Sequence, residues 1–145
     1  MTIEFRKIEV GSPLHERALT LRDDVLRRPL GRALSATDIE YDRQGHHFVA
    51  VDGDEVFGCV GLYPQDEGVV RLRQMAVAPR LQGQGIGAGV LRFAEEWARA
   101  NDIARIELHA RVAAEGFYQR AGYVAEGEIF EEVTVPHRKM WKALL

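Results

Sequence analysis

Cysteine is almost absent from this 145-residue sequence, which has Cys59 as its single thiol. One cysteine cannot form an intrachain disulfide or supply the cysteine cluster of a structural zinc site. Cys59 lies in an apolar segment and is expected to be a small core residue rather than a nucleophile. His46 and His47 are adjacent, but the pattern suggests no third ligand, so the sequence predicts no metal site.

Long hydrophobic runs and an excess of one charge are also missing. No apolar stretch approaches the roughly 20 residues of a membrane-spanning helix, and MTIEFRKIEV at the start lacks the apolar core of a signal peptide. The formal net charge of -3 gives no electrostatic reason to expect nucleic acid or an anionic membrane as a partner. With 46% hydrophobic and 28% charged residues, the composition predicts one globular, cytoplasmic domain over residues 1–145.

The hydrophobic pattern predicts strands and helices in mixed order, with no repeat and no linker. Strands are expected over Ile3–Val10, His47–Val51, Val56–Tyr63, Val69–Val77, Ala104–Ala110, Tyr123–Phe130 and Val133–Leu144. Helices are expected over Leu14–Val25 with Ser12 as the cap, Leu34–Asp42, Ile86–Asn101 and Val112–Ala121. This order predicts an α/β fold with a mixed sheet and helices on both faces, rather than a doubly wound parallel sheet.

Glycines crowd the junction Met75–Leu91, MAVAPRLQGQGIGAGVL, where an apolar strand meets a helical pattern. Glycine weakens a helix, so the junction needs either a tight turn or room for a ligand close to the backbone. A helix start has unpaired N–H groups and the positive end of the helix dipole, and both suit a phosphate group.

Three phosphate-binding patterns compete for this junction. The P-loop is set aside, because no Lys-Ser or Lys-Thr follows a glycine. A dinucleotide fingerprint matches Gly83, Gly85 and Ala88, with Glu107 about 20 residues further on. However, the residues APRL separate these glycines from the strand, whereas the fingerprint requires the glycines to follow the strand immediately. The third pattern, [Q/R]xxGx[G/A], is met by Gln82–Gly87.

The sequence around the junction resembles the GNAT superfamily of N-acetyltransferases. That family's central motif runs strand, short loop, pyrophosphate-binding glycines and helix, as LRQMAVAPRLQGQGIGAGVL does here. AAEGFYQRAGY at residues 113–123 resembles the family's A..FY...GF segment, and GEIFEEVTVPHRKM at residues 127–140 resembles small bacterial members ending GE.F.E.GIPH..M. The resemblance implies the acyl-CoA N-acyltransferase fold, with a mostly antiparallel sheet of about seven strands, and acetyl-CoA as co-substrate.

The resemblance also implies where CoA binds. Its pyrophosphate is expected on the glycine loop, and its pantetheine arm beside the fourth strand, where the N–H of Val77 or a neighbour would polarise the thioester carbonyl. Gly85 and Gly87 are expected against the pyrophosphate, while Gly83 makes the turn and Gly89 serves helix packing. The expected cofactor-binding residues are Met75, Ala76, Val77, Gln82, Gly83, Gln84, Gly85, Ile86, Gly87, Ala88, Phe117 and Tyr118.

Three residues are candidates for catalysis. Tyr118 resembles the family's general acid, which protonates the departing CoA thiolate, although a tyrosine that only packs in the core is the alternative. Glu132 and His137 match the C-terminal motif, where they would bind or deprotonate the acceptor. The alternative for this pair is a surface strand with ordinary polar residues.

Arg71 and Arg73 stand two apart in the fourth strand, so they are expected to share one face with Met75. If that face lines the acceptor cleft, its cations suit a carboxylate or phosphate on the acceptor. The alternative is that both arginines are solvated or paired with Asp or Glu of a neighbouring strand. His109, near the end of the fifth strand, is either another acceptor contact or a packing residue.

The primary hypothesis is an enzyme that transfers an acetyl group from acetyl-CoA to the primary amine of a small acceptor, by direct attack in a ternary complex. A non-catalytic acyl-CoA-binding domain and a nucleotide-dependent oxidoreductase are the alternatives. No nucleic acid, membrane or metal partner is expected. The resemblance also implies a homodimer through the C-terminal strands.

Overall fold

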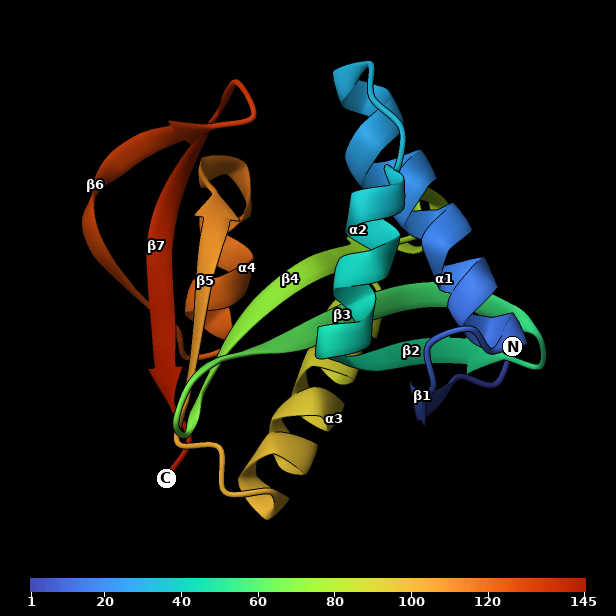
Figure 1. Cartoon of the computed structure of the whole chain (residues 1–145), viewed down its shortest axis with the longest axis horizontal. Coiled ribbons are helices and arrows are strands. Elements are labelled where there is room, and N and C mark those ends of the chain that lie inside the picture. The colour runs from blue at the N-terminus through green and yellow to red at the C-terminus, as the bar shows by residue number, and fades with distance from the viewer.

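A seven-stranded sheet runs through the computed structural model, which describes all residues 1–145 (Figure 1). The strands are β1 Glu4–Ile8, β2 His46–Asp52, β3 Glu55–Asp66, β4 Val69–Val77, β5 Arg105–Arg111, β6 Val124–Glu132 and β7 Val135–Ala143. Their order in the sheet is β1-β2-β3-β4-β5-β7-β6, and every neighbouring pair is antiparallel except the parallel pair of β4 and β5. The predicted mixed, mostly antiparallel sheet is therefore confirmed.

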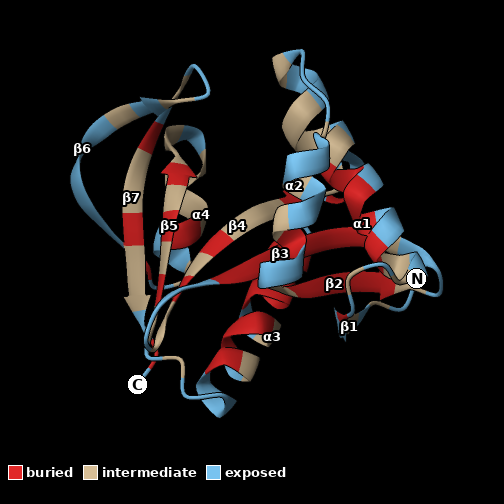
Figure 2. Cartoon of the chain, viewed as in Figure 1, coloured by how far each residue is buried: buried red, intermediate tan, exposed pale blue.

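Helices cover both faces of this sheet, as predicted. They are α1 Pro13–Arg22, α2 Ala36–Tyr41, α3 Ile86–Ala100 and α4 Glu115–Arg120. Apolar side chains of α1 pack on one face of the sheet, whereas those of α3 and α4 join the larger core on the other face. Figure 2 shows the buried residues along β2 and β3 and on the inner sides of α1 and α3, while β6 and α2 are mainly exposed.

Polar caps set the beginnings of the N-terminal helices. The Oγ of Ser12 accepts from the N–H of His15 across 3.3 Å, which confirms Ser12 as the cap of α1. The helical path continues past Arg22 as a π-helical turn over Asp23–Arg27 and ends at Gly31, whose φ of 69° needs a glycine. The predicted helix over Leu14–Val25 is therefore confirmed in place, but its last residues lie in the π-helical turn.

A buried charge cluster holds the first helices on the sheet. The fully buried carboxylate of Asp42 accepts hydrogen bonds from His15 Nε2 at 2.8 Å, Tyr63 Oη at 2.7 Å and Arg22. His47 donates from Nε2 to the carbonyl oxygen of Asp42 across 2.8 Å. Burial works to raise the pKa of Asp42, yet the hydrogen bonds from His15 and Arg22 hold that pKa well below its usual range.

Strands β4 and β5 separate along their length. They pair only between Val69–Arg71 and Arg105–Glu107, although β4 continues to Val77 and β5 to Arg111. Figure 1 shows the two strands diverging, with α4 beside β5. The edge of β4 beyond Arg71 therefore has no strand partner on this side, and an opening forms between the two strands.

A β-bulge at Gln74 changes which way β4 presents its side chains. Gln74 has a φ of 61°, and the register moves from Gly61 opposite Arg73 to Cys59 opposite Ala76, so β4 carries one extra residue. An extra residue reverses the alternation of faces along a strand.

The expectation that Met75 shares a face with Arg71 and Arg73 is therefore wrong. Before the bulge, Leu72 packs into the core beneath α3, so the two arginines lie on the opposite, α1 side. After the bulge, Ala76 packs with the α1 cluster, and Met75 turns towards the core of α3.

Candidate active site

The glycine loop before α3 has a row of free main-chain donors. No backbone carbonyl accepts from the N–H groups of residues 83–88. Gly83 and Gly85 both have a φ of 82°, and a Cβ added to either would meet no atom within 4 Å. The side-chain amide of Gln82 donates to the carbonyl oxygen of Val77 across 3.1 Å, which ties the loop to the end of β4. Free N–H groups at a helix N-terminus beside open space form a site for an anion.

The next glycines of the loop face protein atoms instead. A Cβ at Gly87 would lie 3.2 Å from Phe117 Cε1 and from Val77 Cγ2, so its absence keeps a narrow space between β4 and α4. A Cβ at Gly89 would lie 2.4 Å from Phe5 Cζ, which confirms the prediction that Gly89 serves helix packing.

The side chains of two expected cofactor contacts point away from the loop. Ile86 and Ala76 are both buried, Ile86 in the core between α3 and the sheet and Ala76 in the cluster beneath α1. Any contact that they make with a cofactor is therefore through main-chain atoms. Gln84 is exposed, and Ala88 lies at a second, smaller cavity between α3 and α4.

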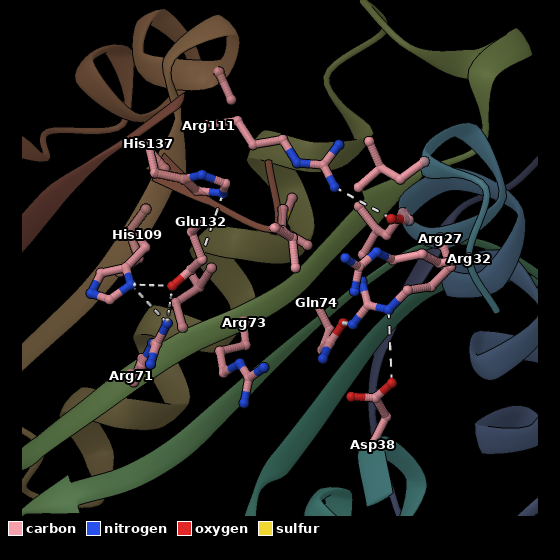
Figure 3. A pocket seen from close by; sticks show the side chains of 18 of the residues that line it. Arg27, Arg32, Asp38, Arg71, Arg73, Gln74, His109, Arg111, Glu132 and His137 are labelled. Carbon is pink, nitrogen blue, oxygen red and sulfur yellow. Dashed lines mark hydrogen bonds and ion pairs between the residues drawn. The ribbon is translucent and has the colours of Figure 1, made fainter. Parts of the chain in front are cut away.

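A cavity of about 810 Å³ lies where β4 and β5 separate (Figure 3). Its walls come from the connection between α1 and α2, from the centre of β4, from the end of β5, and from the turn between β6 and β7. The structure brings together here these predicted site residues: Arg71, Arg73, Met75, His109, Tyr118, Glu132 and His137. Ala76, Val77, Phe117 and the loop Gln82–Ala88 lie outside its lining.

Glu132 is the centre of a polar cluster in this cavity. Its Oε1 lies 3.0 Å from His109 Nδ1 and 3.6 Å from an Arg71 nitrogen, and its Oε2 lies 3.7 Å from His137 Nε2. Burial works to raise the pKa of Glu132, but the hydrogen bond and charge of His109 and the charge of Arg71 lower it overall. Glu132 is therefore a carboxylate at neutral pH, and it pairs with Arg71 from the end of β6, which is not a neighbour of β4 in the sheet.

His109 stands between two competing partners. Its Nδ1 lies 2.9 Å from an Arg71 nitrogen, which can only donate, and 3.0 Å from Glu132, which as a carboxylate can only accept. One ring nitrogen cannot serve both at once. The tautomer that carries its hydrogen on Nδ1 donates to Glu132, and the tautomer without a hydrogen there accepts from Arg71.

His137 has its tautomer set by the backbone. Its Nδ1 lies 2.7 Å from the carbonyl oxygen of Val135, and because a carbonyl only accepts, Nδ1 carries the hydrogen. The Nε2 of the neutral ring therefore has a free lone pair on the side of Glu132. The ring is 5% exposed and stacks on Phe130, so its orientation is fixed. His137 can accept a proton at Nε2.

Tyr118 reaches the cavity from α4, between the rings of Phe117 and Tyr123. Burial alone raises the pKa of its hydroxyl, with no charge or hydrogen bond contributing. The phenol therefore stays protonated through neutral and moderately alkaline pH and can donate its proton.

Sequence reasoning missed three arginines of the same cavity. Arg27 and Arg32 come from the connection after α1, and Arg111 ends β5. Arg27 donates to Gln74 Oε1 across 3.3 Å, and Arg111 donates to the carbonyl oxygen of Leu26 across 3.3 Å. The only signal in the sequence is the basic run RRPLGR, which hydrophobic periodicity does not connect with β4 or β5.

Neither a metal-binding cluster nor a membrane-spanning helix is found in the structure. No group of three or more His, Cys, Asp or Glu side chains is arranged to hold a metal ion. No helix combines the length and the apolar composition that crossing a bilayer requires.

Comparison with known proteins identifies the family. The model of the acetyltransferase (GNAT) family matches residues 14–123. Probable N-acetyltransferase 14 of Xenopus tropicalis is 35% identical over 85 residues, which make up 55% of this chain and 41% of that protein. The uncharacterized N-acetyltransferase YjcF of Bacillus subtilis is 26% identical over 104 residues, 71% of this chain and 74% of that protein.

A solved structure shows the same fold. The crystal structure of an aminoglycoside 6'-N-acetyltransferase complexed with coenzyme A has a TM-score of 0.80 at 20% identity, over 98% of this chain and 97% of that one. The chain spans less than half the length of the Xenopus relative but nearly the whole chain of the aminoglycoside enzyme. With the fold and most of the sequence matched, the chain belongs to the acetyltransferase (GNAT) family.

Proposed function

We propose that the protein transfers the acetyl group of acetyl-CoA to the primary amine of a small acceptor, by direct attack in a ternary complex. The observation that carries the proposal is the convergence of Tyr118, Glu132 and His137 on one cavity beside the open edge of β4. Family membership supports the same chemistry. The aminoglycoside enzyme with this fold was crystallised with coenzyme A, which supports CoA as the carrier.

The residues around β4 fit this cofactor. The N–H groups of residues 83–88 would bind the pyrophosphate, because they have no backbone acceptor and the space beside Gly83 and Gly85 is open. The unpaired edge of β4 beyond Arg71 offers N–H and C=O groups to the two amides of the pantetheine arm. When bound, acetyl-CoA supplies a thioester, whose carbonyl carbon forms the new C–N bond as the C–S bond breaks.

His137 is the proposed general base. An acceptor amine arrives mainly as ammonium and must lose a proton before it attacks. Neutral His137 can take that proton at Nε2, since Nδ1 is occupied by Val135. The carboxylate of Glu132, 3.7 Å from Nε2, then stabilises the imidazolium and attracts the ammonium.

Tyr118 is the proposed general acid. Its hydroxyl stays protonated because burial raises its pKa, so it can donate to the sulfur as negative charge develops there. An N–H of β4 near Val77 would polarise the thioester carbonyl. The nitrogen gives its first proton to His137 before attack and loses a second proton as the amide forms. The sulfur gains the proton of Tyr118, the second proton returns through solvent to the Tyr118 phenolate, and His137 passes its proton to solvent, so one proton is released in each transfer.

A thiol-release assay with acetyl-CoA and a panel of amines tests the proposal. We expect thiol release that depends on the amine, with one N-acetylated product per thiol by mass spectrometry. Tight binding of acetyl-CoA without acetylation of any amine would instead support the non-catalytic acyl-CoA-binding alternative. A titration with nicotinamide dinucleotides should show no binding, and saturable binding there would favour the oxidoreductase.

A further inference from the structure

The cavity is far more basic than the chain that encloses it. It is lined by Arg27, Arg32, Arg71, Arg73 and Arg111, against the two carboxylates Asp38 and Glu132. The whole chain, by contrast, has a formal net charge of -3. The positive charge is therefore concentrated at this cavity and opposes the charge of the chain as a whole.

Most of this positive charge lacks a close acidic partner. Arg71 is paired with Glu132, but Arg27 lies 3.8 Å from Asp38, at the limit of an ion pair. Arg111 donates only to a backbone carbonyl. Arg73 lies 5.0 Å from the ring centre of Tyr41, and this stacking leaves its charge without a carboxylate.

The arginines of this cavity also repel one another. Burial lowers the pKa of Arg27, and Asp38 only partly opposes the effect. The guanidinium charges of Arg73 and Arg111 add to the lowering. Half-buried like charges destabilise the free protein, and an anion bound among them would remove that cost.

The phosphates of CoA do not account for these arginines. No residue of Ala76–Ala88, which includes the whole glycine loop, lines this cavity. A separate cavity of about 240 Å³ between α3 and α4 has its own cations, Arg92, Arg120 and Lys142. The arginines of the larger cavity are therefore available to a different ligand.

The cavity has two chemically different ends. Figure 3 shows Glu132, His109 and His137 gathered on one side, and Arg27 and Arg32 across the cavity with Arg111 between them. An amine at the first end lies near a carboxylate and a base. A carboxylate or phosphate at the other end meets guanidinium groups, which bind such groups through paired N–H donors.

We infer that the acceptor is a small amphoteric molecule, whose amine faces Glu132 and His137 and whose carboxylate or phosphate is held by Arg27, Arg73 and Arg111. This assignment of substrate class rests on the proposed acetyl transfer. The residues expected to bind the anion also change. Arg71 is paired with Glu132, so Arg27 of the α1–α2 connection and Arg111 of β5 replace it as anion-binding residues.

The test uses matched acceptors and the CoA-saturated protein. ω-Amino acids with two to five methylene groups are compared with ω-amino alcohols of the same lengths and with the phosphate monoesters of those alcohols. Binding is measured by calorimetry with CoA present, and turnover by thiol release with acetyl-CoA. The variants are Arg27→Gln, Arg111→Gln and their double variant, with Arg17→Gln as the control, because Arg17 is exposed on α1 outside the cavity.

We expect at least one anionic series to bind ten-fold or more tightly than the alcohols, with the carboxylate and phosphate arms showing which anion is preferred. The double variant should raise Kd and KM for anionic acceptors ten-fold or more, with kcat at saturation and the Kd of acetyl-CoA nearly unchanged. Arg17→Gln should match the wild type. Arg27→Lys should restore part of the loss, because it keeps the charge.

Two outcomes would overturn one proposal without the other. If the alcohols are bound and acetylated as well as the anionic amines, or if the double variant leaves the preference intact, the inference about the acceptor is wrong and acetyl transfer stands. If no amine is acetylated but anionic amines still bind in an arginine-dependent way, the binding site stands and the proposed reaction is wrong. Equal or absent binding of all three series also overturns the inference.

Discussion

His137 donates its Nδ1–H to the carbonyl oxygen of Val135 across 2.7 Å, and this contact gives the ring a free Nε2. In His137→Asn the side-chain amide can still donate to Val135, but it has no basic nitrogen. We expect kcat/KM to fall about 100- to 10,000-fold, the range for loss of a general base.

His46→Asn is the matched control for that variant. His46 lies on β2 with its ring 4.3 Å from that of Trp97, and it does not line the cavity. The activity of His46→Asn should match the wild type. If His137→Asn keeps wild-type kcat/KM, His137 is not the base and another group takes the proton.

Tyr118→Phe separates the general acid from a packing tyrosine. The ring stays between Phe117 and Tyr123, and the lost hydroxyl contributes no hydrogen bond that affects its pKa. We expect the melting temperature and the Kd of acetyl-CoA to be unchanged, while kcat falls about 100-fold. With an acetyl thioester whose leaving thiol has a lower pKa, the fall in kcat caused by Tyr118→Phe should be smaller. Equal kcat values for wild type and variant would show that Tyr118 only packs in the core and is not the general acid.

Variants of Gly85 and Gly89 are expected to differ, the first in acetyl-CoA binding and the second in the stability of the fold. Gly85→Val forces a β-branched residue to a φ of 82° and fills the space before the free N–H groups, so the Kd of acetyl-CoA should rise at least ten-fold. Gly89→Ala brings a methyl group against the Phe5 ring and should lower the free energy of unfolding by about 1–3 kcal/mol. The Kd of acetyl-CoA should be unchanged in Gly89→Ala. Equal loss of binding in both variants contradicts this reading of the loop.

The fold could be predicted from the sequence because its signals are local. The cap at Ser12 and the glycine junction each lie within a few residues of the element that they begin or end. The bulge at Gln74 was not predicted, because the break in alternation at Arg73 and Gln74, which are both polar, does not by itself specify an extra residue in the strand. It appears only when β3 and β4 are paired, and it moves Met75 to the other face of the sheet.

The site was predicted where a motif marked it and missed where only the fold assembles it. Glu132 and His137 belong to a recognisable C-terminal pattern, and the structure brings them to the same cavity as Tyr118. Arg27 and Arg111 are 84 positions apart in the sequence. They meet because the π-helical turn after α1 and the separation of β5 from β4 bring both to the opening, and neither feature has a signal in the residues themselves.

Asp42→Asn tests the buried charge cluster beneath α1. The variant leaves the guanidinium of Arg22, which is 2% exposed, without its anionic partner. Removing one partner of a buried ion pair costs about 3–5 kcal/mol, which we expect as the loss in free energy of unfolding in urea at pH 7. Asp54→Asn, in the exposed turn between β2 and β3, should change it by no more than about 0.5 kcal/mol.

The same variant predicts a change in acid stability. The pKa of Asp42 is lower in the folded protein than the value of about 3.9 for an unfolded aspartate. Its carboxylate therefore stabilises the fold fully above about pH 4, and this contribution is lost as the pH falls towards the folded pKa. The difference in unfolding free energy between wild type and Asp42→Asn should be constant from about pH 5 to 7 and should narrow below about pH 4. A difference that stays constant down to the acid transition would show that lost packing, rather than the charge of Asp42, accounts for the destabilisation.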